Sequence, residues 1–194
     1  MKRILISGFS FLILLSSTSL LAQDKKTQSF TIERVIKAPA EKVWAVVGED
    51  FGAIANSHPG IVSSSYLQGS LQGGEGVERV CNLNEAGTRY THEKQVDYDP
   101  ENYTFRAQVF YAEGVPVVPE YSYMRYKVER IDDQFSRLIM SMTYRTKPAL
   151  MGTLAKGKFQ KTIADYALAV DHHVRTGEVV NQDNFETIKA QYQD

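Results

Sequence analysis

The sequence predicts an α+β fold in which a curved, seven-stranded antiparallel sheet surrounds one long C-terminal helix. Two observations carry this prediction. The stretch 148–177 repeats apolar residues at helical spacing, and the residues upstream of it form short strand-like segments separated by turn residues. An amphipathic helix of this length needs an apolar sheet face to cover it, so the two halves of the chain require each other.

The long helix is predicted between Pro148 and Gly177. Its apolar residues recur at steps of three or four and therefore share one side: Met151, Ala155, Phe159, Ile163, Ala167, Val170 and Val174. The opposite side is charged, and we expect it to face water: Lys156, Lys158, Lys161, Asp165, Asp171 and Arg175. Gly177 predicts the end of the helix, because glycine readily adopts the left-handed conformation.

The N-terminus has the pattern of a secretory signal peptide. Lys2 and Arg3 precede the apolar run 4–15, and Ala22 offers a cleavage position, so we expect an exported protein, periplasmic or secreted. An uncleaved membrane anchor is the alternative. Polar residues interrupt the run, however, and it is shorter than the roughly 20 residues that a spanning helix needs.

Removal of residues 1–22 leaves 172 of 194 residues, enough for one domain with a core. We predict a polar leader at 23–29, the domain at 30–177, and a C-terminal tail at 178–194 that forms a short helix or a loose end. Without Lys2 and Arg3, 20 basic side chains face 23 acidic ones, so the net charge changes from −1 to −3. No basic block points to nucleic acid. Cys81 is the only cysteine, which excludes an intramolecular disulfide, and its apolar strand predicts a buried thiol.

The elements of the domain follow a definite order. A first strand at 30–37 ends before Pro39, and two short helices follow at 40–47 and 51–56. Six further strands are predicted at 61–67, 76–83, 88–98, 103–111, 121–131 and 135–146. Short turns join these six strands, which indicates an antiparallel meander.

Several short motifs occur in an order found in one superfamily. They are A-P-x-x-x-V-W at 38–44, Phe51–Gly52 followed by His58–Pro59, the strand pair with Glu93, Asp97, Asp99, Tyr103 and Phe105, and the loop from Pro116 to Tyr121. In this order the chain resembles the helix-grip (SRPBCC, START-like) superfamily: StAR-related lipid-transfer domains, the birch-pollen-allergen family, polyketide cyclase/dehydrase-like proteins and plant abscisic-acid receptors. The chain departs from the pattern at Asn56–Ser57, where members often carry tryptophan before His-Pro.

The resemblance implies a hydrophobic cavity between the sheet and the C-terminal helix, entered past loops at one end. It also implies that Glu93 faces this cavity. A carboxylate in an apolar pocket needs a cation, and Arg79, Arg106 and Arg125 are the candidates. A solvent-facing Glu93 is the alternative.

The aromatic residues leave two interpretations open. Tyrosines on the strands suit a pocket for a mostly apolar ligand, but they also suit cross-strand pairs on the outer face of the sheet. In the strand 121–131, alternation with charged residues turns Tyr126 and Val128 inward. The resemblance would turn Tyr121 and Tyr123 inward instead, and a bulge near Met124 would reconcile the two.

From these arguments we predict two groups of site residues. The predicted ligand-binding residues are Arg79, Tyr90, Glu93, Phe105, Tyr121, Tyr123, Phe159 and Ile163, and the predicted mouth of the cavity comprises His58, Pro116 and Pro119. The loop around the two prolines either gates the cavity or packs over the end of the helix. No cofactor or metal site is predicted, since His172 and His173 are adjacent on the helix and point about 100° apart.

Three functions remain open. The favoured one is an exported carrier of a hydrophobic small molecule or lipid. A polyketide cyclase/aromatase-like enzyme is the first alternative, with Glu93, His58 or a tyrosine moving protons, and a structural or protein-interaction domain with a filled interior is the second. No hydrolase or phosphate-binding motif is present. We expect no stable membrane insertion after cleavage of the signal peptide, and the sequence does not specify an oligomeric state.

Overall fold

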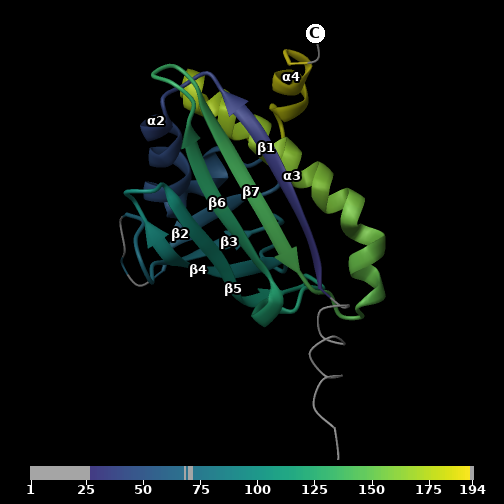
Figure 1. Cartoon of the computed structure of the whole chain (residues 1–194). Helices are drawn as coiled ribbons and strands as arrows, with labels where there is room; N and C mark the ends of the chain where they lie inside the picture. Colours follow the sequence, from purple (N-terminus) through teal and green to yellow (C-terminus); the bar gives the residue numbers. More distant parts are fainter. Residues whose placement is uncertain (1–26, 68, 70–71, 193–194) are drawn as a thin grey trace, which may run out of the picture.

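The computed structural model describes residues 27–67, 69 and 72–192, in which seven strands and one long helix dominate (Figure 1). The predicted signal peptide and most of the predicted leader lie outside the described residues. The elements in chain order are β1 (Gln28–Ile36), α2 (Ala40–Trp44), the π-helical turn η1 (Ala45–Glu49), the 3-10 helix η2 (Phe51–Asn56), β2 (Ser63–Tyr66), β3 (Glu78–Asn82), β4 (Tyr90–Asp99), β5 (Thr104–Glu113), the 3-10 turn η3 (Pro119–Tyr121), β6 (Tyr123–Arg130), β7 (Ser136–Tyr144), α3 (Leu150–Thr176) and α4 (Phe185–Ala190).

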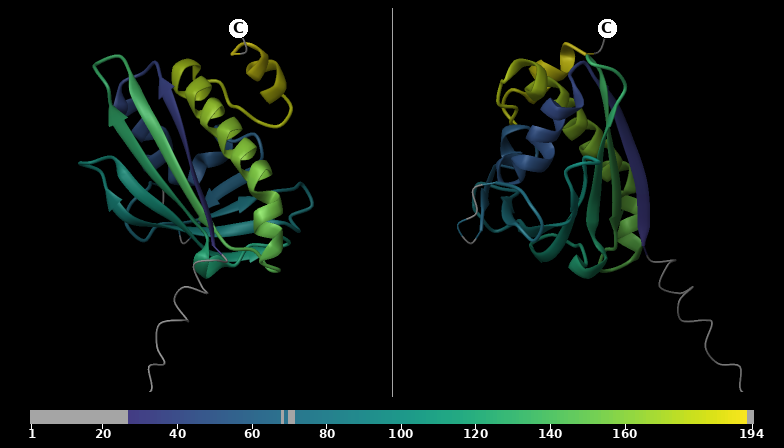
Figure 2. Two further views of the ribbon diagram at one scale, coloured as in Figure 1. Left: turned by 45° about the vertical axis from the view of Figure 1, so that its right-hand side comes forward. Right: turned by 60° about the vertical axis from the view of Figure 1, so that its left-hand side comes forward.

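The strands form one antiparallel sheet in the order β1-β7-β6-β5-β4-β3-β2. This confirms the predicted meander, with the first strand added at its far edge beside β7. Two register irregularities interrupt the pairing of β4 with β5, between His92 and Glu93 and between Val96 and Asp99. Irregularities of this kind bend a strand and increase its twist. The sheet accordingly curves around the helical side of the molecule (Figure 2).

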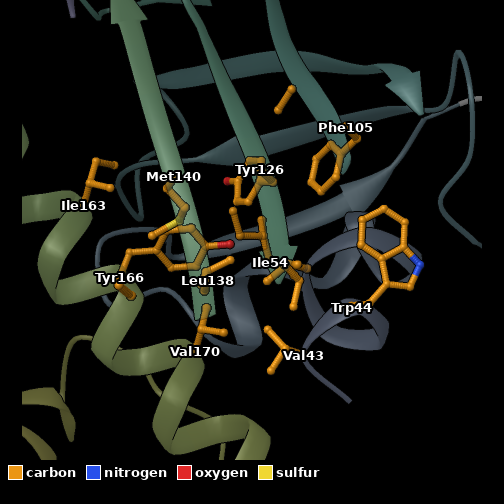
Figure 3. Packing of buried hydrophobic residues seen from close by; sticks show 14 of the residues in the cluster. Val43, Trp44, Ile54, Phe105, Tyr126, Leu138, Met140, Ile163, Tyr166 and Val170 are labelled. Atoms are coloured by element: carbon orange, nitrogen blue, oxygen red, sulfur yellow. The ribbon is translucent and has the colours of Figure 1, made fainter. Parts of the chain in front are cut away.

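The concave face of the sheet carries the apolar core. In β7, Leu138 and Met140 are fully buried, while the alternating Arg137 and Ile139 are less so. Figure 3 shows Leu138 and Met140 beside Tyr126 of β6, facing side chains of α3. Alternation along each strand therefore sorts apolar residues to the face that α3 covers.

Helix α3 confirms the predicted long helix. It ends where predicted, because Gly177 has a φ of 74° and donates its N–H to the carbonyl oxygen of His173 at 2.8 Å. Ile163, Ala167 and Val170 of the predicted stripe are buried against the sheet. Met151, at the start of the same stripe, is exposed instead.

The charged side of α3 requires one correction. Asp171, predicted to face water, is only 3% exposed, and its Oδ2 lies 2.7 Å from Nη2 of Arg34 on β1. The C-terminal half of α3 is covered on a second side by α4, whose Phe185 and Ile188 pack on Leu168 of α3. The tail thus forms a helix, and it buries residues that a two-layer arrangement would leave in water.

Cys81 is a free, buried cysteine, and burial raises the pKa of its thiol to about 12. It therefore remains a protonated, unreactive side chain at neutral pH. Among the described residues, no group of three or more potential metal ligands occurs. In the same part of the chain, no helix has the length and apolarity needed to cross a membrane.

Candidate functional site

A cavity of about 170 Å³ lies between the concave face of the sheet and α3. Its walls are mainly aliphatic and aromatic, and its charged and imidazole side chains come from β3, β4 and the segment after η2. The residues that line it are Ile54, His58, Ile61, Arg79, Thr91, Glu93, Ala107, Val109, Val115, Val117, Ser122, Tyr123, Met124, Tyr126, Met142, Phe159, Ile163 and Tyr166.

A buried ion pair forms the polar part of this wall. Arg79 and Glu93 are direct partners in the β3–β4 register, so the two strands bring their side chains together. Nε and Nη2 of Arg79 donate to Oε2 of Glu93 at 2.9 and 2.6 Å. Arg79 is almost completely buried, whereas the Glu93 side chain is 17% exposed. The carboxylate is therefore the member of the pair that borders open space.

Both members of the ion pair make further contacts with the protein. Nη1 of Arg79 donates to the carbonyl oxygen of Phe51 at 2.7 Å, and its guanidinium lies over the Phe51 ring at 3.9 Å. Thr91 donates its hydroxyl to Oε1 of Glu93 at 3.2 Å. Burial opposes the charge of Arg79, but the neighbouring Glu93 raises its pKa above the ordinary value. The pair is thus a fixed, charge-balanced feature of the cavity wall.

His58 is the second polar group of the cavity. The N–H of Gly60 donates to Nδ1 of His58 at 2.9 Å, which leaves the proton of the neutral ring on Nε2. Burial, followed by the positive charge of Arg79, lowers the pKa of His58 to about 4. In the part of the chain that the structure describes, Nε2 has no protein hydrogen-bond partner. A neutral N–H donor is therefore available at the cavity wall.

Aromatic rings complete the site. The ring of His58 lies against that of Tyr166 of α3, tilted by 30° with centroids 4.5 Å apart, and Tyr166 contacts Tyr126 of β6 edge to face at 6.4 Å. Figure 3 shows Tyr166 directed from α3 toward the strand that carries Tyr126. Burial raises the pKa of both tyrosines, so both hydroxyls stay protonated at neutral pH. These rings give the cavity an aromatic wall opposite the aliphatic residues of the sheet.

The family model for polyketide cyclase/dehydrase and lipid-transport proteins matches residues 27–170 of this sequence. The chain belongs to this family. The match spans every strand, the short helical elements α2, η1, η2 and η3, and most of α3. It confirms the predicted membership of the SRPBCC, or helix-grip, superfamily.

Solved structures share the helix-grip fold. The ZhuI aromatase/cyclase from Streptomyces sp. R1128 is 16% identical, with a TM-score of 0.59, and the match covers 77% of this chain and 94% of that one. Norcoclaurine synthase from Thalictrum flavum, in complex with dopamine and hydroxybenzaldehyde, is 17% identical, with a TM-score of 0.56 and coverage of 85% and 96%. Ara h 8.0201 is 24% identical, with a TM-score of 0.58 and coverage of 77% and 99%. No curated protein matches the chain in sequence.

Of the predicted site residues, six line the cavity of this family member: His58, Arg79, Glu93, Tyr123, Phe159 and Ile163. Among the three candidate cations, Arg79 is the one that pairs with Glu93. Arg106 and Arg125 lie instead near Asp97, at 3.1 and 3.7 Å.

The other five predicted residues lie outside the cavity lining. Tyr90 stacks on Tyr111 at 5.8 Å and is separated from Glu93 by an odd number of positions, which places it on the outer face of the sheet. Phe105 stacks on Tyr126 at 4.4 Å and is buried in the neighbouring part of the core. The ring of Tyr121 lies 4.9 Å from the guanidinium carbon of Arg145.

The loop at 115–119 borders the cavity, but its valines and not the predicted prolines form the lining. Val115 and Val117 line the cavity, whereas the predicted mouth residue Pro116 lies between them in the chain and Pro119 follows Val117 by two positions. The carbonyl oxygen of Pro119 accepts a hydrogen bond from Nε2 of Gln108 at 3.0 Å. The loop is therefore packed against the cavity and held by side-chain hydrogen bonds.

The two predictions of which tyrosines of the strand 121–131 face inward are not reconciled by a bulge. The pairing of β6 is regular on both sides through Met124, so the suggested bulge there is wrong. Met124 and Tyr126 line the cavity. Tyr123 reaches the cavity lining as well, but its ring lies near the guanidinium groups of Arg106 and Arg125, with centroid distances of 5.4 and 5.5 Å.

Sequence reasoning missed two residues that shape the site. Tyr166 follows Ile163 by three positions and Phe159 by seven, so helical spacing alone places it on the cavity side. Thr91 lies two positions before Glu93 and therefore on the same strand face. Helical periodicity would have added Tyr166 to the predicted site, and strand parity already places Thr91 on the face of Glu93.

Proposed function

We propose that this protein binds and carries a small hydrophobic molecule in the cavity between the sheet and α3. The observation that carries the proposal is an apolar cavity with the buried Arg79–Glu93 pair in its wall. A buried ion pair is seldom more stabilising than apolar residues of the same volume. Its position beside open space favours a role in orienting a ligand.

The size of the cavity limits the ligand. Its volume of about 170 Å³ is close to the ~150 Å³ of an engineered apolar cavity that admits benzene. Many drug-sized pockets are larger, roughly 300–1,000 Å³. We therefore propose a ligand about the size of one substituted ring, or a longer molecule that inserts one end.

The charges of the wall indicate a neutral ligand. Arg79 and Glu93 balance each other, and His58 is neutral, so an added ionic group would find no free countercharge. A hydroxyl group suits the wall best. Its proton can be donated to a Glu93 oxygen, and its oxygen can accept from Nε2–H of His58.

We further propose that the protein acts after export, in the periplasm or outside the cell. The support is the signal-peptide pattern of residues 1–22. A carrier of apolar molecules is useful in such a compartment, where these molecules must cross an aqueous space. N-terminal sequencing of the protein purified from the periplasm or the medium would test processing after Ala22.

The test of the carrier function compares toluene with p-cresol, which differ by one hydroxyl group. Calorimetric titration should show binding of both, with p-cresol tighter. Glu93→Gln should reduce the preference for p-cresol, while Glu33→Gln on the exposed face of β1 should leave it unchanged. Ala107→Leu, which fills the cavity, should weaken both ligands. The proposal would be overturned if neither ligand binds and if native mass spectrometry of the purified protein also detects no retained molecule.

Cyclase-like catalysis is the second candidate, and one observation favours it. The Nε2–H of His58 and the carboxylate of Glu93 line the same cavity. A donor beside a carbonyl oxygen and a carboxylate near the α-carbon are the two groups needed to remove an α-proton. Exchange of the methyl protons of acetophenone in D₂O, followed by NMR, would report this step. Exchange at the buffer rate, unchanged in His58→Asn, would leave the carrier as the only function.

A further inference from the structure

The start of α3 exposes large apolar side chains at one end of the molecule. Leu150 is 70% exposed and Leu154 is 77% exposed, which are the highest values among the large hydrophobic side chains of the described residues. They lie four positions apart and therefore on the same side of the helix. Met151 beside them is 42% exposed. Burial of these side chains needs a partner outside the domain.

The same segment is strongly basic. Residues 134–164 contain no aspartate or glutamate, although the whole chain has a net charge of −1. Six cations fall within this stretch, and five of them lie in or just before α3: Arg145, Lys147, Lys156, Lys158 and Lys161. Lys158 follows Leu154 by four positions and so continues the exposed row of Leu150 and Leu154. The N-terminus of α3 adds the positive end of the helix dipole.

This exposed end adjoins the cavity. The N–H of Lys147 donates to the carbonyl oxygen of Pro116 at 3.0 Å, and that of Val118 donates to the carbonyl oxygen of Arg145 at 2.7 Å. These bonds tie the start of α3 to the loop whose Val115 and Val117 line the cavity. Figure 2 shows the start of α3 and the turn before β6 at the same end of the molecule.

We infer that the start of α3 docks this protein on an anionic lipid surface. Leu150 and Leu154 enter the boundary between headgroups and acyl chains, and Lys158, roughly 6 Å further along the helix axis, lies at the level of the phosphates. Lys161 contributes less, since its Nζ is 2.7 Å from Asp165. Exposed Glu120 of η3 opposes the attraction.

Other partners fit this surface less well. A stable protein interface buries about 800 Å² on each side, whereas the apolar part here is three side chains on a convex helix turn. A second copy of the chain would bring two basic segments together, and like charges at an interface disfavour association. A lipid surface needs neither a large complementary area nor an opposing groove.

Docking in this orientation places the loop beside the cavity against the lipid. If the proposed carrier function also holds, an apolar ligand could pass between lipid and cavity without crossing bulk water. The docking itself rests only on the exposed leucines and the basic residues. The two proposals can therefore fail separately.

Vesicle co-sedimentation tests the inference. The sample is the full chain purified after expression, and mass spectrometry defines its N-terminus. We expect binding to phosphatidylcholine vesicles that contain phosphatidylglycerol, and weaker binding to pure phosphatidylcholine or at high salt. Leu150→Ser combined with Leu154→Ser should lower the partition coefficient by roughly tenfold or more. Lys158→Glu should lower it by about fivefold or more.

Two matched variants at other places serve as controls. Val179→Ser removes an exposed apolar side chain beyond the C-terminal end of α3, and Lys42→Glu reverses an exposed charge on α2. Both should bind the vesicles as the parent protein does. Equal binding by the folded double leucine variant would overturn the inference. Absence of binding to anionic vesicles by the parent protein would also overturn it. So would a result in which the leucine substitutions disrupt a dimer of the protein and leave its binding to vesicles unchanged.

Discussion

Two buried ion pairs of this protein have similar chemistry and different surroundings. Arg79–Glu93 joins β3 to β4 and borders the cavity. Arg34–Asp171 joins β1 to α3, and the ring of Tyr192 lies 5.3 Å from the guanidinium carbon of Arg34. In the first pair the arginine is buried and the carboxylate is partly open. In the second the carboxylate is buried and the arginine is 26% exposed.

This difference separates a ligand-facing pair from a structural one. The open member of the first pair is an acceptor that borders empty space, so it can serve a bound molecule. The open member of the second pair is a guanidinium that reaches water, and its partner Asp171 is enclosed by protein. The two pairs should therefore respond differently to substitution.

The largest expected effect is that of Arg79→Met. The substitution leaves Glu93 without its cation and the Phe51 carbonyl oxygen without its donor, so we expect a loss of about 3–5 kcal/mol in the free energy of unfolding. Arg34→Met is the matched control. It also removes the nearest cation of a buried carboxylate, but Arg175 stays 3.6 Å from Asp171, so we expect a smaller loss of about 2–3 kcal/mol. Urea unfolding of both variants measures this, and equal losses would contradict the distinction.

The pH dependence of stability should reveal His58 beside the first pair. Its pKa of about 4 lies below the ordinary value of about 6.5, so as pH falls the unfolded chain takes up the proton first. The contribution of neutral His58 to the free energy of unfolding is fully present above pH ~6.5. It is lost as the pH falls to ~4, and the loss is on the order of 3 kcal/mol.

His58→Asn provides the comparison, since its amide oxygen can still accept the Gly60 N–H. The variant should have a flatter stability profile between pH 6.5 and 4 than the parent protein. A parent profile identical to that of His58→Asn would show that His58 protonates freely in the fold.

A smaller effect is expected for Asp171→Asn in the second pair. The amide removes the negative charge but keeps an acceptor for Nε of Arg34, so we expect a loss of about 1–2 kcal/mol. Thermal unfolding measures it. Binding of p-cresol should stay unchanged, because Asp171 does not line the cavity. A loss of binding would mean that the second pair also controls the site.

The smallest effect should come from Tyr192→Phe. Only the hydroxyl that lies 3.1 Å from Nδ1 of His172 is removed, while the ring beside Arg34 remains. We expect a loss of about 0.5–1.5 kcal/mol in chemical denaturation and no change in ligand binding. A loss above that range would show that α4 depends on this hydrogen bond for docking.

The local sequence determined the elements of this fold. Strand alternation, turn residues and helical spacing are properties of neighbouring residues, so they predicted seven strands and the helix that ends at Gly177. Strand alternation also separates two of the predicted site residues. Tyr90 and Glu93 are separated by an odd number of positions, so an unbroken strand cannot turn both toward the cavity.

Only the tertiary structure decided which polar groups meet. Three arginines were equivalent candidates for Glu93, and the β3–β4 register selected Arg79 because it places the two residues directly opposite each other. Asp171 is buried beside Arg34, which lies 137 positions away in the chain. Register and packing join residues that are distant in sequence, and no local pattern of one chain records these contacts.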